Sequence, residues 1–251
     1  EKYRSKMPLH QLDADFMGPI KPESIRRCRF GLIIVCPRSG LAWGIPLRHK
    51  NSNVLHVRKL IRRIRTRFAT MIGQKVLFYF RTDNEAAWDG QFSDMLEVNG
   101  VYPLRPPPYC PQLNGCAERA VRDFSHGLRA LLLHCDKRLW CFAMEFYSDV
   151  RARAKVSRRT GLTPLESAES ELLPVEDPRR QTAASEAKPP TEDERSQLLS
   201  RLPFKVFGSL CICFVQDPVR VRVEVGSGVP TSKLSPHWSP GVYIGHDNQS
   251  S

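Results

Sequence analysis

The sequence predicts a mixed α/β domain, followed by a linker and a small β-rich module. Short apolar, β-branched runs alternate with stretches whose apolar residues recur every three or four positions, a pattern typical of strands and helices that share a core. Hydrophobic residues make up 41% of the 251 residues, which excludes a wholly disordered or low-complexity protein. A stretch rich in proline, glutamate and alanine then interrupts this pattern. We expect a core domain over 8–168, a flexible linker over 169–201 and a β-rich module over 202–251.

The first part of the core domain predicts three strands. Residues 12–16 alternate apolar and acidic side chains, and the alternation stops at Gly18-Pro19. Two further apolar runs, 30–36 and 41–47, flank the turn 37–40. The short turn between them predicts a hairpin.

A strongly basic helix is predicted next. One apolar stripe runs along it, formed by Val54, Val57, Ile61, Ile64, Phe68 and Ile72. Basic side chains fill much of the remaining surface, namely Arg58, Lys59, Arg62, Arg63, Arg65 and Arg67. This surface is either a solvated helix face or one that contacts phosphates. We name Arg58, Arg62 and Arg65 as candidate DNA contacts.

The rest of the core domain continues the alternation of strands and helices. The pattern predicts, in order, a strand over 75–80, a short helix over 86–98, a short strand over 100–104, a proline-rich loop over 106–115, and helices over 116–134 and 139–156. In the module beyond the linker, the apolar runs 210–215 and 219–225 predict strands. These strands serve either DNA binding and multimerisation or structure alone.

The charge balance indicates a polyanionic partner. The net charge is +12, and nucleic acid is the first candidate for such a chain. An anionic membrane is the second candidate, but no apolar run approaches the roughly 18 residues that cross a bilayer. Eight cysteines without a CxxC pair or a zinc pattern fit a reducing intracellular compartment. The chain begins at Glu1 with neither a signal peptide nor an initiator methionine, so we expect a piece of a longer protein.

Three acidic residues stand where a reaction could use them. Asp15 lies in an apolar strand, Asp83 at the C-terminal end of another, and Glu118 in the first turn of the helix after the proline-rich loop. Each also has an ordinary structural explanation. Asp15 could lie on the surface of an edge strand, Asp83 could end its strand, and Glu118 could pair with Arg122. Composition and periodicity do not place the three together in space.

The segments that carry these acids resemble the integrase core of retroelements. The motifs are DFMGP at 15–19, RTDN at 81–84 and PPYCPQLNGCAER at 107–119. The order of the acids, and the 35 positions from Asp83 to Glu118, are similar to that family's acidic triad. The resemblance implies an RNase H-like core, which is a five-stranded mixed sheet flanked by helices.

Three further segments resemble the Ty1/copia branch of that family. They are TPLE at 163–166, FKVFGS at 204–209, and the stretch from KLSP at 233–236 to GVYIGH at 241–246. Together the segments cover nearly the whole chain outside the linker. This resemblance implies that the chain is part of a retrotransposon Pol polyprotein, with a nuclear location and a cytoplasmic particle stage.

The resemblance implies a DNA-joining enzyme that uses two divalent ions, Mg²⁺ or Mn²⁺. Its reactions are 3′-end processing and strand transfer of element DNA into host DNA. Two ions about 3.5–4 Å apart can activate the attacking oxygen and stabilise the leaving one. Such hard cations prefer carboxylate oxygens. By resemblance, Asp15 bridges both ions, and Asp83 and Glu118 each hold one.

The resemblance also implies DNA contacts and partners. On the proline-rich loop the candidate contacts are Tyr109, Gln112 and Asn114, although the loop can equally be a plain connector. On the following helix they are Arg119, Arg122 and Arg129. The implied partners are element-end DNA and target DNA, bound by a homo-multimer away from any membrane.

Two departures from the family keep other interpretations open. Glu85 stands where relatives carry glycine, so it could tilt Asp83 or add a competing charge. The family's zinc-binding module is also missing from this sequence. The alternatives are an inactive DNA-binding or assembly module from a decayed or domesticated element, and a related DNA transposase or nuclease.

Overall fold

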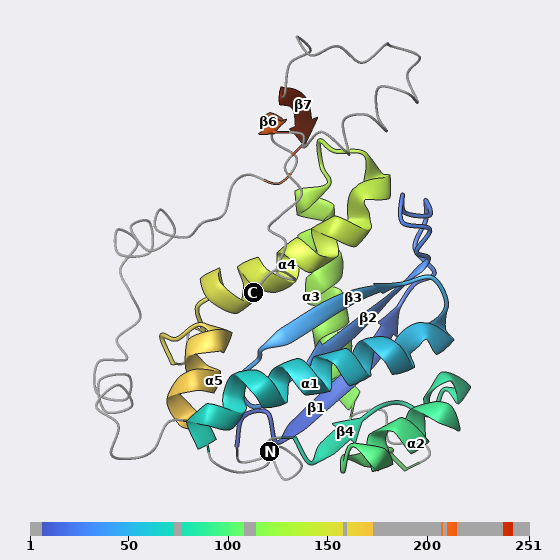
Figure 1. The fold of residues 1–251 in the computed structure, drawn as a ribbon, viewed down its shortest axis with the longest axis vertical. Coiled ribbons are helices and arrows are strands. Elements are labelled where there is room, and N and C mark those ends of the chain that lie inside the picture. The colour runs from blue at the N-terminus through green and yellow to red at the C-terminus, as the bar shows by residue number, and fades with distance from the viewer. Residues whose placement is uncertain are drawn as a thin grey trace. The chain divides into compact units, whose positions relative to one another are not determined.

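The computed structural model describes residues 7–72, 77–107, 114–157, 160–172, 207, 210–214 and 238–242 (Figure 1). The chain divides into two compact units, residues 1–203 and 204–251. Among the described helices, none combines the length and the apolar character that a membrane crossing needs.

A five-stranded mixed sheet organises the first unit. Its strands are β1 (Gln11–Met17), β2 (Phe30–Val35), β3 (Ala42–Leu47), β4 (Tyr79–Arg81) and β5 (Tyr102–Leu104). The spatial order is β3-β2-β1-β4-β5, with β1, β2 and β3 antiparallel and β4 and β5 parallel to β1. The predicted hairpin and the predicted RNase H-like fold class are confirmed. Because β1 is the central strand, Asp15 does not lie on an edge strand.

Within the described part of the chain, five α-helices flank this sheet. They are α1 (Asn53–Ile72), α2 (Gln91–Val98), α3 (Gly115–Leu131), α4 (Trp140–Ala154) and α5 (Pro164–Leu172). Short 3₁₀ turns, Lys50–Ser52, Ala86–Trp88 and Lys137–Leu139, precede α1, α2 and α4. Helices α1, α2 and α5 share a core with one face of the sheet, while α3 and α4 pack on the other face. Figure 1 shows α1 in front of the sheet and α3 behind it.

The alternation of side chains along β1 decides which residues face which helices. Successive side chains of a strand point to opposite faces of its sheet. Leu12 and Ala14 are fully buried in the core shared with α1. Asp13 and Asp15 therefore lie on the α3 side, where the hydroxyl of Ser125 also approaches the sulfur of Met17 at 3.5 Å. The acidic residues of β1 thus share a face with the helix that carries Glu118.

Three predicted elements are shorter or more broken than their patterns suggested. The strand predicted from residue 75 begins at Tyr79, because Leu77 adopts a positive φ of 70° that extended backbone does not allow. The helix predicted over 86–98 divides into a 3₁₀ turn and α2, and Gly90 between them has a φ of 53°. The predicted helix over 116–134 ends earlier, at Leu131.

Helix α5 runs past the predicted end of the core domain, and the second unit contains a pair of strands. Helix α5 continues past residue 168 to Leu172, which is buried in the core. In the second unit, β6 (Leu210–Phe214) pairs antiparallel with β7 (Trp238–Val242). The strand predicted over 219–225 lies outside the described residues, as do 75 and 76 of the predicted strand over 75–80.

The absence of a side chain at Gly44 lets both α3 and α4 approach the sheet. A Cβ atom at Gly44 would lie 2.5 Å from a ring carbon of Phe124 on α3 and 2.6 Å from the Cγ of Met144 on α4. Real Cβ atoms do not tolerate such distances, so both helices would have to shift. The position of α3 therefore depends on glycine at residue 44.

We expect Gly44→Ala to lower the free energy of unfolding by about 1–3 kcal/mol, because it overpacks a closely fitted core. The control is Gly115→Ala in the first turn of α3, where a Cβ would meet nothing within 4 Å. Thermal unfolding measures both variants. Equal stability of Gly44→Ala and wild type would contradict the close packing.

Candidate active site

Three elements bring the predicted acids together. Asp15 is half-buried in the central strand β1, Asp83 follows the neighbouring strand β4, and Glu118 is exposed in the first turn of α3. Burial raises the pKa of Asp15 from its ordinary 3.8 to about 6. A hydrogen bond from its neighbour's backbone N–H opposes this rise, while the charges of Asp83, Glu118 and Glu85 add to it. The carboxylates are thus near enough to repel one another.

The carboxylate of Asp83 is held by Trp88, a residue that the sequence patterns did not single out. The indole Nε1–H of Trp88 and the backbone N–H of Glu85 both donate hydrogen bonds to Asp83 Oδ1. Trp88 is fully buried and stacks on Phe16, with 4.4 Å between ring centroids. A hydrogen-bonded tryptophan thus connects Asp83 to the residue beside Asp15.

The charge of Glu85 has a local partner. Lys50, in the 3₁₀ turn before α1, donates to both carboxylate oxygens of Glu85, at 2.6 and 2.8 Å. The same ammonium group lies 5.1 Å from the ring centroid of Phe16, within the range of a cation–π contact. The competing charge expected from Glu85 is therefore paired, although it still adds to the raised pKa of Asp15.

A further buried acid, Asp13, lies on the same face of β1. Only 1% of its surface is exposed. Gln11 donates a 2.6 Å hydrogen bond to its Oδ1, and Arg81 on β4 lies 3.9 Å from its Oδ2. The alternation of two acids along one strand could have identified this residue, because positions two apart share a face. Arg81 compensates a charge that would otherwise be buried beside the candidate site.

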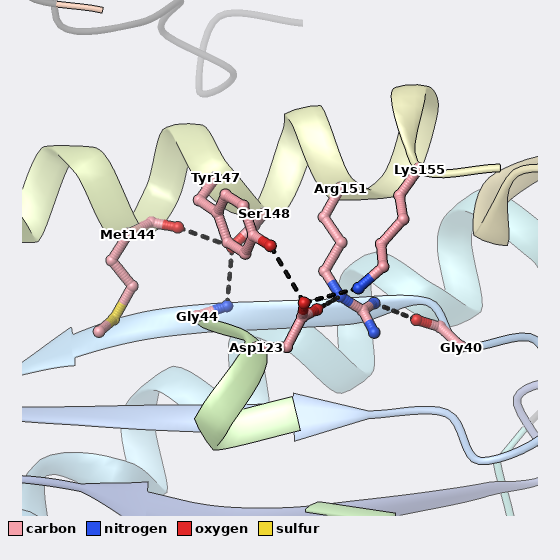
Figure 2. Close-up of polar contacts among 8 residues, drawn as sticks. All are labelled: Gly40, Gly44, Asp123, Met144, Tyr147, Ser148, Arg151 and Lys155. Carbon is pink, nitrogen blue, oxygen red and sulfur yellow. Dashed lines mark hydrogen bonds and ion pairs between the residues drawn. The ribbon is translucent and has the colours of Figure 1, made fainter. Parts of the chain in front are cut away.

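An ion-pair network fixes α3, and with it Glu118, against α4. Figure 2 shows Tyr147, Arg151 and Lys155 converging from α4 on Asp123 of α3. Arg151 also donates to the backbone oxygen of Gly40, in the turn between β2 and β3. Burial by itself would raise the pKa of Asp123, but the hydrogen bonds from Lys155 and Arg151 hold that pKa below its usual value. The carboxylate thus stays charged and ties α3 to α4.

The structure distributes the predicted DNA contacts around α3. Arg119, Arg122 and Arg129 are exposed along it, and Arg119 donates to the oxygen of Gly115 one turn earlier. Asn114 is buried at the start of α3, and within the described residues its side-chain oxygen accepts no hydrogen bond. Tyr109 and Gln112 lie outside the described residues.

The predicted basic face of α1 lies away from the acids. Arg58 and Arg62 are exposed, and Arg65 donates to the backbone oxygen of Asn99 at the end of α2. Helix α1 packs on the face of the sheet opposite to Asp15. The structure therefore does not bring these arginines to the acidic cluster.

The three acids are of the residue type that a hard cation prefers, but their side chains are not placed closely enough to hold one. Carboxylate oxygens are the ligands that Mg²⁺ prefers, and mutually repelling carboxylates gain from a cation between them. Among the described residues, however, no three His, Cys, Asp or Glu side chains converge closely enough to hold an ion.

The sheet order and the position of the acids define an RNase H-like α/β domain with a carboxylate cluster beside its central strand. The chain is similar to the catalytic core domain of BIV integrase, with 21% sequence identity, 63% of this chain and 92% of that chain covered, and a TM-score of 0.47. It is also similar to the catalytic core domain of HTLV-2 integrase, solved in complex with magnesium in a trimeric form. That similarity has 14% identity, coverage of 66% and 99%, and a TM-score of 0.49. No protein-family model and no curated protein matches the chain.

We expect Mg²⁺ to stabilise the protein at pH 7.5 and much less at pH 5. Because the pKa of Asp15 is raised, its ionisation without a cation costs stability as the pH rises from about 3.8 to about 6. A bound cation offsets this cost only where Asp15 is charged. At ten times its Kd, Mg²⁺ would add about 1.4 kcal/mol, or about 3–5 °C in Tm.

Thermal unfolding with and without Mg²⁺ measures this increment, and Asp15→Asn should abolish it at both pH values. Glu97→Gln, at an exposed acid on α2, is the matched control. An increment of the same size in wild type and Asp15→Asn would show that the ion binds elsewhere.

Proposed function

We propose that this chain is the catalytic core of a retroelement integrase, a metal-dependent polynucleotidyl transferase of the Ty1/copia type within a Pol polyprotein. The observation that supports the proposal is that Asp83 and Glu118 lie near enough to Asp15, on the central strand, for their charges to raise its pKa. Their types, order and spacing match the family's acidic triad, and three separate elements contribute them. An acidic cluster without this role would only cost stability.

The proposed reactions are 3′-end processing and strand transfer. In each, an oxygen attacks phosphorus in line and the 3′ oxygen of a DNA strand leaves. Two Mg²⁺ or Mn²⁺ ions would supply activation of the attacking oxygen and stabilisation of the leaving one. Asp15, Asp83 and Glu118 would hold the ions. Lys50 would keep the charge of Glu85 from competing for them.

The proposed partners are element-end DNA and target DNA, bound by a homo-multimer in the nucleus after a cytoplasmic particle stage. The net charge of +12 and the exposed arginines of α3 support DNA as the partner. Asn114 stands at the N-terminus of α3, where backbone N–H groups favour a phosphate. Arg58 and Arg62 would contact a different segment of DNA, because α1 lies on the other side of the sheet.

A strand-transfer assay with short duplexes that carry a recessed 3′ CA end tests this function. We expect joining in Mg²⁺ or Mn²⁺, and a loss of at least about 100-fold in Asp83→Asn and Glu118→Gln with DNA binding retained. Each change removes one charged ligand and keeps nearly the same shape. Glu97→Gln should join DNA like wild type.

Two results would contradict the proposal. Joining that survives in Asp83→Asn would exclude the triad as the reacting site. Salt-sensitive DNA binding without joining by the wild type would favour the inactive binding module instead.

A further inference from the structure

On the sheet face that carries Asp15, the described helices leave side chains of β4 and β5 exposed. Helices α3 and α4 pack against β1, β2 and β3 on this face. The pairing register places Gln11 beside Tyr79 and Tyr79 beside Tyr102, so these side chains share the face of Asp13 and Asp15. The tyrosines on β4 and β5 are 36% and 64% exposed. This part of the face therefore presents aromatic rings to solvent.

The two tyrosines form one aromatic surface rather than two isolated rings. Their ring centroids lie 6.1 Å apart on neighbouring strands, and His10 contacts Tyr79 edge-on at 5.3 Å. Leu104 occupies the next position on this face of β5 and is half-buried. Adjacent exposed aromatic side chains on a sheet mark a binding surface more often than scattered apolar residues do.

The surface leads directly to the acidic cluster. Asp83 is four positions after Tyr79, two of them beyond the end of β4, which is at most about 13 Å at about 3.3 Å per residue. About four stacked nucleotides span that length at roughly 3.4 Å each. A DNA strand that reaches Asp83 could therefore lay its next few bases over the tyrosines.

Tyrosine suits this task better than an aliphatic residue would. A flat ring stacks on any nucleobase, whereas a protein partner needs a matching apolar shape. The net charge of +12 favours a polyanionic occupant over a second, equally charged copy of the chain. Both observations favour nucleic acid.

We propose that Tyr79 and Tyr102 form a stacking platform for unpaired bases of a DNA strand that ends at the acidic cluster. This inference rests on the proposed function, because the DNA partner comes from it. The platform would receive the few bases that separate from their complement near the reacting phosphate. It would bind single-stranded overhangs and leave blunt duplexes to the arginines of α3.

Fluorescence anisotropy of the full chain with labelled DNA tests the platform. We expect Tyr102→Ala to weaken binding of a duplex with a four-base overhang by about 5- to 150-fold, the effect of losing one stacked base. Binding of the blunt duplex should change by less than about twofold, since it uses phosphate contacts. Tyr102→Phe keeps the ring and should bind like wild type.

The matched control is Val98→Ala, at an apolar side chain that is 87% exposed on α2. A 2-aminopurine base in the overhang gives a second measurement, because stacking quenches its emission. We expect quenching with wild type and Tyr102→Phe, and none with Tyr102→Ala.

Each contrary result has its own meaning. If Tyr102→Ala binds the overhang duplex as tightly as Val98→Ala does, the platform is overturned and the proposed function stands. Self-association that Tyr102→Ala abolishes while DNA binding stays unchanged would make this face an interface between copies, and overturn the platform. If the wild type binds neither the overhang duplex nor the blunt duplex, the proposed function and the platform are both overturned.

Discussion

The concentration of negative charge beside the central strand is the constraint on which the rest of the site depends. Asp15 is half-buried, and its pKa rises to about 6 because burial and the neighbouring carboxylates disfavour its charge. Proteins rarely keep such an arrangement unless a ligand offsets it. Neighbouring basic side chains compensate part of this negative charge but not all of it. Lys50 pairs with Glu85 and Arg81 lies by Asp13, but within the described residues no ion pair reaches Asp15.

Contacts between α3 and α4, away from Glu118, hold these mutually repelling acids in place. Asp123 is held by Arg151 and Lys155, so the helix that carries Glu118 is tied to α4. Gly44 lets that helix approach the sheet closely. The ion pairs of Asp123 and the packing of Phe124 against Gly44 thus lie one to two turns beyond the first turn of α3, which carries Glu118. This separation leaves the exposed Glu118 free to serve a ligand.

The sequence predicted those features that depend on local pattern. The strands and helices follow from periodicity, whereas only the resemblance of the motifs to the integrase family implied that Asp15, Asp83 and Glu118 act together. The side chains that form hydrogen bonds or ion pairs with the residues of the site could not be anticipated. Lys50 and Glu85 are 35 residues apart, and Trp88, which donates a hydrogen bond to Asp83, lies in a 3₁₀ turn that replaces the start of a predicted helix. Periodicity shows which face a side chain takes, but not which distant side chain meets it.

The central claim is that Asp15, Asp83 and Glu118 together bind divalent cations. A crystal soaked in Mn²⁺, with an anomalous difference map recorded near the manganese edge, tests it most directly. We predict a peak about 2.2 Å from carboxylate oxygens of Asp15, Asp83 and Glu118. A saturated crystal in which no peak lies beside these three carboxylates would contradict the claim.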